Sequence, residues 1–174
     1  MDAPTIRAAT PFDVPALSEL AKRTWSDAFG DSVGAEDRAV ELARTRSEAY
    51  FLDALTESTI LVAEDKSGAL VGYVQFGDVD IPEVDVRPAD QALHRLYVDT
   101  AWQGSGLGRM LTDAALAHPR LARVDRIYLT VWEQNERALR LYETFGFRTV
   151  GRTTFTIGVG EIAEDLVMVL DRVG

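Results

Sequence analysis

Cysteine is absent from this sequence of 174 residues, and histidine occurs only twice, at His94 and His118. Without cysteine the chain forms no disulfide, holds no cysteine-ligated metal and offers no thiolate nucleophile. The two histidines are 24 residues apart, and neither belongs to a His-x-x-x-His pattern, so we predict no metal site. The lack of disulfides is typical of proteins inside the cell, and we expect a cytoplasmic protein.

Long apolar runs are missing too. No run of about 18 or more apolar residues occurs, so we expect neither a membrane-spanning helix nor a membrane partner. Residues 1–13 lack a basic segment followed by an apolar one, so we expect no secretory signal. The composition, with 47% hydrophobic and 26% charged residues, is that of a globular protein, and the length fits a single domain over residues 1–174.

Positive charge is in deficit, since the formal net charge is −10. This argues against nucleic acid as a partner, because phosphate contacts need a basic surface. Residues 31–90 carry 14 acidic and 5 basic side chains, whereas residues 91–148 carry 6 acidic and 8 basic ones. Two interpretations stay open: an ordinary charged surface, or two ligands of opposite charge that meet on one protein.

Hydrophobic periodicity and turn residues predict a mixed α/β sheet with helices on both faces. Helices are predicted at about 10–30, at 36–55 with an internal break, from the turn at 103–108 to about 117, and at 136–145. Strands are predicted at 5–10, 59–63, 69–76, 93–98, 127–132, 148–156 and 166–170. In the first helix, Thr10 is the cap, Pro11 opens the first turn and Gly30 ends the helix.

A glycine-rich turn follows the strand at 93–98 and leads into a helix. Its glycines, Gly104, Gly106 and Gly108, allow positive φ and a close approach of the main chain to a ligand. The first N–H groups of a helix have no partner within it, and the helix dipole favours an anion there. A pyrophosphate therefore fits this site, with Arg109 as a fixed positive charge. A turn that merely packs tightly is the alternative.

Two better-known phosphate motifs do not fit the turn. A Walker P-loop needs Gly-Lys-Ser/Thr, which the sequence lacks. The dinucleotide fingerprint G-x-G-x-x-G needs glycine where Arg109 stands, and Asp125 precedes its strand instead of ending it.

A second informative segment runs from residue 129 to residue 147. Asn135 is a suitable helix cap, and Tyr142 follows seven residues later on the same helix face. Taken alone, Tyr142 is best interpreted as a core aromatic side chain whose hydroxyl group is hydrogen-bonded.

Together the two segments resemble the GNAT acetyltransferase superfamily. The family's cofactor motif, Gln/Arg-x-x-Gly-x-Gly/Ala, is matched by Gln103, Gly106 and Gly108. Its later pattern, Asn-x-x-Ala-x-x-x-Tyr-x-x-x-Gly-Phe, is matched by Asn135, Ala138, Tyr142, Gly146 and Phe147. The resemblance covers most of the chain. It implies a single-domain α/β fold: a mixed, mostly antiparallel sheet of about seven strands, with helices on both faces and two central strands splayed apart.

The resemblance also implies N-acetyltransferase activity with acetyl-coenzyme A as co-substrate. The pantetheine arm would pair with the main chain of Leu96, Tyr97 and Val98. The pyrophosphate would be held by the turn residues Gln103, Gly104, Ser105, Gly106, Leu107 and Gly108, with Arg109. Asn135 would hydrogen-bond the cofactor. Tyr142 would bind near its sulfur and protonate the departing thiolate as a general acid, an effect worth about 10²–10⁴-fold.

The general base is left open by the sequence. Some members of the family carry a glutamate five residues before the matching asparagine, where this chain has Thr130. The candidates are Glu133, His94 and an acidic residue of the 78–90 loop acting through water.

The acceptor is also open. Residues 129–142 resemble the bacterial spermidine/spermine acetyltransferase branch, and the acidic segment at 31–90 suits a cationic polyamine. A protein N-terminus, an amino acid, an aminated antibiotic and a non-catalytic acetyl-coenzyme A sensor remain as alternatives. A homodimer, in which the last strands of two copies pair or exchange, is a further possibility.

Overall fold

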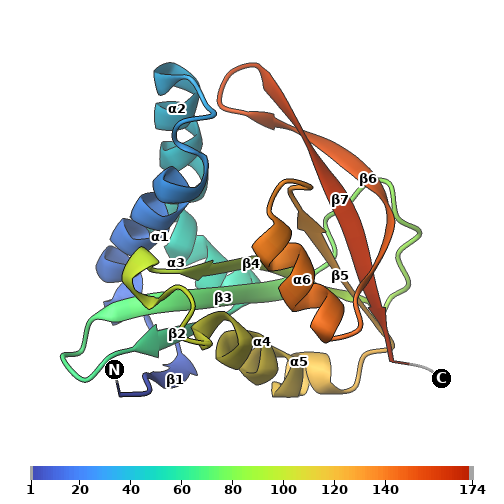
Figure 1. Cartoon of the computed structure of the whole chain (residues 1–174), viewed down its shortest axis with the longest axis horizontal. Helices are drawn as coiled ribbons and strands as arrows, with labels where there is room; N and C mark the ends of the chain where they lie inside the picture. Colours follow the sequence, from blue (N-terminus) through green and yellow to red (C-terminus); the bar gives the residue numbers. More distant parts are fainter. Residues whose placement is uncertain (1, 173–174) are drawn as a thin grey trace.

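The computed structural model describes residues 2–172, so positions 1, 173 and 174 of the predicted single domain lie outside the described residues. One seven-stranded sheet, in the order β1-β2-β3-β4-β5-β7-β6, runs through the molecule (Figure 1). Neighbouring strands are antiparallel except β4 and β5, which are parallel. This confirms the predicted sheet. The strands are β1 (Thr5–Ala8), β2 (Thr59–Glu64), β3 (Leu70–Asp78), β4 (Gln91–Val98), β5 (Arg126–Val131), β6 (Arg148–Ile157) and β7 (Glu161–Asp171).

Helices cover both faces of the sheet, as predicted. On one face, α1 and α3 bury apolar side chains such as Leu17 and Phe51 against β2 and β3. On the other, α4, α5 and α6 bury Leu111, Leu121 and Tyr142. No helix among the described residues is long and apolar enough to cross a membrane. The helices are α1 (Val14–Phe29), α2 (Ala35–Thr45), α3 (Glu48–Glu57), α4 (Leu107–Ala117), α5 (Pro119–Ala122) and α6 (Glu136–Thr144).

The predicted helix boundaries have identifiable local causes. The Asp13 carboxylate accepts a hydrogen bond of 2.8 Å from the backbone N–H of Thr10, which fixes the chain entering a 3-10 turn (Pro11–Asp13) and then α1. The break inside the second helical stretch falls between α2 and α3. There the Ser47 hydroxyl accepts from the N–H of Tyr50 at 3.2 Å and caps α3.

Two elements differ from the prediction. The short helix α5 was not predicted; it begins at Pro119, and His118 Nδ1 accepts from the N–H of Arg120 at 3.2 Å. Strand β7 begins at Glu161, five residues before the predicted start. Its first half lies in a long hairpin with β6 whose side chains are largely exposed, so it lacks the apolar pattern used to recognise strands.

The central strands β4 and β5 separate soon after they meet. They pair only at Gln91 with Ile127, Ala92 with Tyr128, and Leu93 with Leu129. Beyond Leu93, β4 continues beside β3 while β5 continues beside β7, and a bulge in the β3–β4 ladder marks the point of departure. The predicted splaying is thus confirmed. It leaves the side of residues 94–98 that faces β5 without a partner strand among the described residues (Figure 1).

Candidate active site

The glycine-rich turn adopts the backbone conformation for which its glycines were singled out. Gly104 has φ +82° and Gly106 has φ +88°, both in the left-handed region that favours glycine. Gly106 is the N-cap of α4, and a Cβ atom added to it would meet no atom within 4 Å. The turn is therefore open toward the side from which a ligand would approach.

The amide groups of this turn fall into two sets. The N–H groups of Gln103, Ser105 and Leu107 donate within the turn, to Thr100 O at 3.2 Å, Trp102 O at 3.3 Å and Ser105 Oγ at 3.4 Å. Those of Gly104, Gly106, Gly108 and Arg109 donate to no acceptor among residues 2–172. Four main-chain N–H groups, in the turn and in the first residues of α4, are therefore free to bind an anion.

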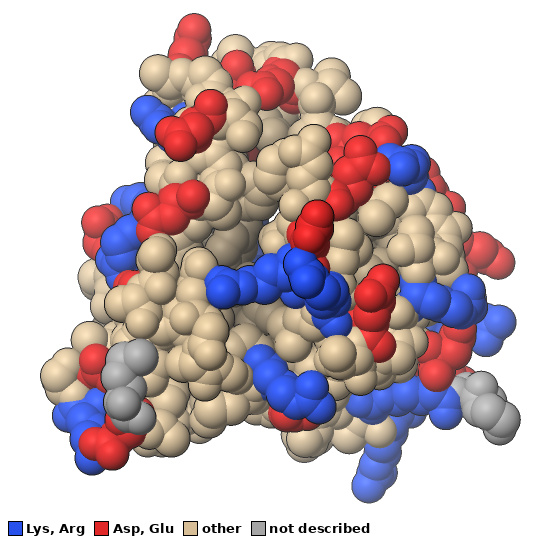
Figure 2. All heavy atoms as spheres, viewed as in Figure 1, with Lys and Arg blue, Asp and Glu red and all other residues tan. Residues whose placement is uncertain are grey.

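Arg137, which the sequence analysis missed, lies over this turn. Its Nη1 donates to Gln103 Oε1 at 2.7 Å, and its Nη2 would lie 4.0 Å from a Cβ atom on Gly104. Helix α6 supplies this cation because it packs against α4, where Gly108 leaves room for Leu141. Figure 2 shows basic side chains gathered over α6 and α4, beside a recess in the surface. The local charge at the turn is positive even though the chain is acidic.

Arg109 points toward the far end of α6. Its Nη1 donates to Thr144 Oγ1 at 3.4 Å, and its guanidinium lies 5.0 Å from the centre of the Phe145 ring. The side chain is within one helical turn of the free amides, but here it holds α4 against α6. Its contact with a pyrophosphate stays a prediction.

Tyr142 is buried, with 7% of its surface exposed, and its ring packs edge-on against Phe147. Burial raises the pKa of Tyr142 above its usual range, and the nearby Tyr97 hydroxyl adds to the shift. The phenol is therefore protonated at physiological pH and available as a proton donor. Tyr142 belongs to the apolar cluster against which Leu96 and Val98 of β4 pack, so it lies near the strand that leaves β5.

Asn135 is the N-cap of α6, the structural role that the sequence suggests for it. Its Oδ1 accepts from the N–H of Ala138 at 3.2 Å and caps α6. This bond uses only the oxygen, so the amide nitrogen is free to donate to a ligand.

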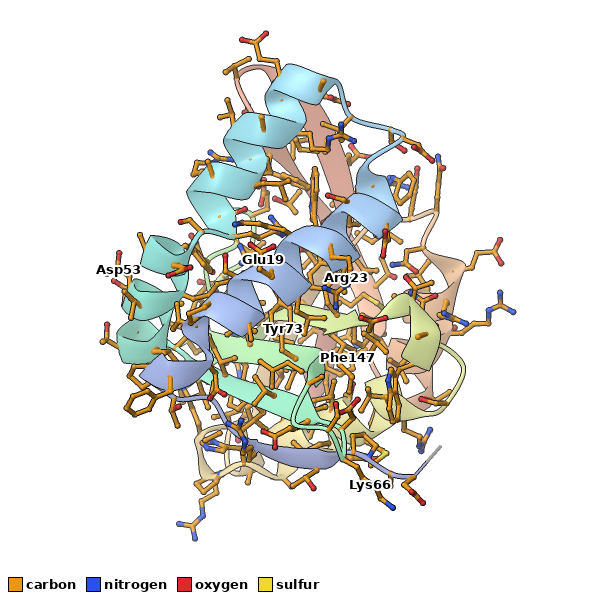
Figure 3. The ribbon with its side chains drawn as sticks, turned by 90° about the vertical axis from the view of Figure 1, so that its left-hand side faces the viewer. Glu19, Arg23, Asp53, Lys66, Tyr73 and Phe147 are labelled. Carbon is orange, nitrogen blue, oxygen red and sulfur yellow. The ribbon has the colours of Figure 1, made fainter. Side chains whose placement is uncertain are left out.

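The end of β4 is held by aromatic stacking on the other face of the sheet. Tyr97 stacks on Tyr73 of β3 at 5.7 Å, and the Tyr97 hydroxyl accepts from Arg46 Nη2 at 3.3 Å. Figure 3 shows the labelled Tyr73 behind α1, between that helix and the sheet. These contacts fix Leu96, Tyr97 and Val98 as a rigid edge, which is what pairing with an extended ligand requires.

A pocket of about 330 Å³ lies where β4 and β5 part. Leu93 and Thr130 come from the two strands, Tyr50 from α3, and Asp80 and Ile81 from the loop after β3. The remaining lining residues are Ala92, His94 and Arg95. The pocket lies on the α3 side of the sheet, whereas the glycine-rich turn and Tyr142 belong to the α4–α6 side.

The three candidate bases lie in different places. Glu133 forms an ion pair of 2.9 Å with Arg152 and does not line the pocket. His94 lines the pocket, and its Nε2 lies 2.7 Å from Asp78 O. Burial lowers the pKa of His94. In the acidic loop, Asp80 lines the pocket.

Other carboxylates of that loop are used structurally. Asp78 pairs with Arg120 at 3.0 Å, and Asp90 pairs with Arg126 at 2.5 Å. Asp165 of β7, which no sequence pattern singles out, is the diagonal neighbour of Thr130 in the β5–β7 ladder.

Comparison with known proteins gives one consistent result. The sequence pattern of the Acetyltransferase (GNAT) family matches residues 15–147. An uncharacterized N-acetyltransferase of Mycobacterium tuberculosis is 31% identical over 163 residues, which cover 92% of this chain and 99% of that protein.

Two further proteins resemble parts or the whole of the chain. A spermine/spermidine N(1)-acetyltransferase of Bacillus subtilis is 36% identical over 89 residues. That match spans only 59% of the Bacillus protein and 51% of this chain. The structure of a PaiA N-acetyltransferase from Thermoplasma acidophilum, in complex with coenzyme A, superposes with a TM-score of 0.77. It covers 98% of this chain and 99% of that one at 18% identity, which shows a shared fold.

Proposed function

This chain belongs to the GNAT family of acetyltransferases, and we propose that it transfers the acetyl group of acetyl-coenzyme A to an amine. One observation carries the proposal: the free amides of the glycine-rich turn, the unpaired edge of β4 and the protonated Tyr142 lie on one side of a split sheet. The acceptor pocket is on the other side of the same split.

The cofactor is assigned to residues whose chemistry fits it. The N–H groups of Gly104, Gly106 and Gly108, with the Arg137 guanidinium, suit a pyrophosphate, because they combine free donors, a helix dipole and a positive charge. The pantetheine arm carries amides, and an unpaired strand edge such as that of Leu96–Val98 offers main-chain partners for them.

The proposed reaction is a direct attack of the amine on the thioester carbonyl. The nitrogen of the neutral amine forms a bond to the carbonyl carbon, and the carbon–sulfur bond breaks. The thiolate takes the Tyr142 hydroxyl proton, and the nitrogen gives one N–H proton to the phenolate left behind. Burial holds Tyr142 in its protonated form, as a general acid requires. An acyl-enzyme on cysteine is excluded, because the chain has none.

A polyamine is the acceptor that the observations favour. The Bacillus relative is named for spermine and spermidine, and the pocket contains the Asp80 carboxylate, which attracts cations. Arg95 also lines the pocket, where it is held away from its centre by Tyr50, on which it stacks at 4.4 Å, and by Thr45 O, to which Nη1 donates at 2.7 Å.

Two measurements test the proposal. Calorimetric titration is expected to show binding of coenzyme A and acetyl-coenzyme A, and the absence of both would refute it. A thiol-release assay with acetyl-coenzyme A then compares spermidine, spermine, amino acids, aminoglycosides and a peptide with a free N-terminus. Polyamines are expected to give the highest kcat/KM. Turnover with another amine would keep the acetyltransferase and reject the polyamine. Cofactor binding without any turnover would favour a sensor module.

A further inference from the structure

We propose that Asp165 is the proton acceptor for the attacking amine and that it acts through the hydroxyl of Thr130. The inference rests on the proposed acetyl transfer and adds to it the missing base. Thr130 occupies the position where some family members carry a glutamate, and the neighbouring strand β7 supplies a carboxylate to the same place.

The strand register brings the two side chains together. Thr130 lies opposite Val167 and Val131 opposite Leu166, so Asp165 is the diagonal neighbour of Thr130. Side chains two residues apart on a strand point to the same face, and diagonal neighbours are within reach of each other. That face is the one that carries the pocket, because Val167 packs there with Ile81 and Ala92, which also line it.

Thr130 connects Asp165 to the pocket. The threonine lines the pocket beside Leu93, at the point where β4 and β5 part. Its hydroxyl can donate one hydrogen bond and accept another. With Asp165 as the acceptor on one side, the oxygen lone pairs face an amine that enters the pocket from the other.

The surroundings of Asp165 leave its carboxylate without a competing cation. No ion pair to Asp165 occurs among the described residues. On the other face of the hairpin, Glu164 pairs with Arg152 at 2.5 Å. Opposite Asp165 on β6 stands the uncharged, buried Thr153.

Burial raises the pKa of Asp165 to about 6, and the Thr130 side chain acts in the opposite direction. No charged group contributes to this shift. The charged or titratable residues of the pocket itself are Asp80, His94 and Arg95, with Tyr50. A carboxylate with a pKa near 6 is ionised at neutral pH and a much better proton acceptor than an ordinary surface aspartate.

The proton transfer balances. The amine enters as an ammonium ion and gives one N–H proton to Thr130 Oγ1, while the Thr130 hydroxyl proton passes to the Asp165 carboxylate. The freed lone pair forms the bond to the thioester carbon. The sulfur leaves with the electrons of the carbon–sulfur bond and takes the Tyr142 proton. As the amide forms, its nitrogen gives its second N–H proton to the Tyr142 phenolate, so that at the end only Asp165 carries an extra proton. Solvent exchange then restores the Asp165 carboxylate.

Three variants test the assignment: Asp165→Asn, Thr130→Val and the matched control Glu164→Gln. The control changes the residue just before Asp165, whose side chain lies on the opposite face of β7. Each is first checked for its melting temperature and its calorimetric affinity for acetyl-coenzyme A, both expected to match the wild type. Thiol release is then measured from pH 5 to pH 9.5 with the best amine of the panel.

The pH profile distinguishes a base from a structural residue. In the wild type, kcat/KM is expected to rise tenfold per pH unit below about 6 and to be level above about 7, because ionised Asp165 accepts the proton of the ammonium form. Asp165→Asn is expected to lower kcat/KM at pH 7 by about 10²–10⁴-fold. The variant must also lose the level region. Without the carboxylate, it can use only amine that is already deprotonated in solution, so its kcat/KM keeps rising with pH.

Thr130→Val removes the hydroxyl that lowers the pKa of Asp165, so the rising limb of its pH profile must move to higher pH and its rate must fall. Glu164→Gln must behave as the wild type. If the wild type acetylates an amine and Asp165→Asn retains the same level region, the inference is overturned and the proposed function stands. An unchanged Thr130→Val profile overturns the relay. If the wild type acetylates no amine, the proposed function itself has failed.

Discussion

Replacing Gly106 with alanine separates backbone strain from ligand binding. Gly106 has φ +88°, and a Cβ atom there meets nothing within 4 Å, so the substitution creates no clash within the protein. Gly68, in the hairpin between β2 and β3, has φ +85° and the same empty surroundings. The two alanine variants therefore carry the same strain, and only one of them lies at the proposed pyrophosphate site.

The expected stability change follows from that strain. An L-residue in the left-handed region costs about 1–2 kcal/mol relative to glycine. For a chain of this size, such a change lowers the melting temperature by roughly 2–8 °C. Gly106→Ala and Gly68→Ala are both expected to fall in this range in the absence of ligand, as measured by thermal unfolding monitored by circular dichroism.

The expected change in affinity differs between the two. At Gly106 the added methyl group occupies the space beside the free amides, and losing one hydrogen bond to a charged group costs about 1.5–3 kcal/mol. Calorimetry should thus show coenzyme A binding weakened by about 10- to 150-fold in Gly106→Ala and unchanged in Gly68→Ala. If Gly106→Ala binds coenzyme A as tightly as Gly68→Ala does, the turn does not hold the pyrophosphate and the reasoning is refuted.

Three further variants test other parts of the structure. Tyr142→Phe should keep its affinity for coenzyme A and lose about 10²–10⁴-fold in the rate of thiol release; an unchanged rate would remove Tyr142 as the acid. Arg137→Ala should weaken coenzyme A binding, most strongly at low ionic strength, whereas the control Arg140→Ala, whose side chain pairs with Glu136 on the exposed side of α6, should not. Asp13→Asn should lower the free energy of unfolding at pH 7 by about 1–2 kcal/mol. Hydrogen bonds from Arg7 lower the pKa of Asp13 to about 2, so urea unfolding should show this difference shrinking as the pH falls from about 4 to 2. A difference that stays constant over that range would contradict the assignment.

The order of the elements was predictable because each is encoded locally. The cap at Thr10, the break inside the second helical stretch and the apolar runs of β2 and β3 depend on neighbours in sequence, and all appear where they were expected. The start of β7 was missed for the converse reason. Residues 161–165 form a strand through their pairing with β6 and carry no apolar pattern of their own.

The same distinction divides the candidate site. The glycine-rich turn and the Asn135–Tyr142 spacing are continuous in sequence, and a resemblance to a known family was enough to single them out. Arg137 reaches the turn only because α6 packs on α4. Asp165 reaches Thr130 only because β7 pairs with β5, and a one-residue change of register would turn the carboxylate to the other face. Neither contact can be derived from spacing along the chain.

Under the proposed function, the split between β4 and β5 lets an acidic chain accommodate an anionic cofactor and a cationic acceptor. Charges in solvent farther apart than about 8 Å are largely screened at physiological ionic strength, so each ligand responds to its own surroundings and not to the net charge of −10. On the α4–α6 face those surroundings are free amides and the Arg137 cation; on the α3 face they include Asp80 and the Thr130–Asp165 pair. A continuous sheet would keep the two ligands about 10 Å apart, the thickness of a packed layer. Where β4 and β5 part, this layer is interrupted, and the proposed direct attack of the amine on the thioester takes place there.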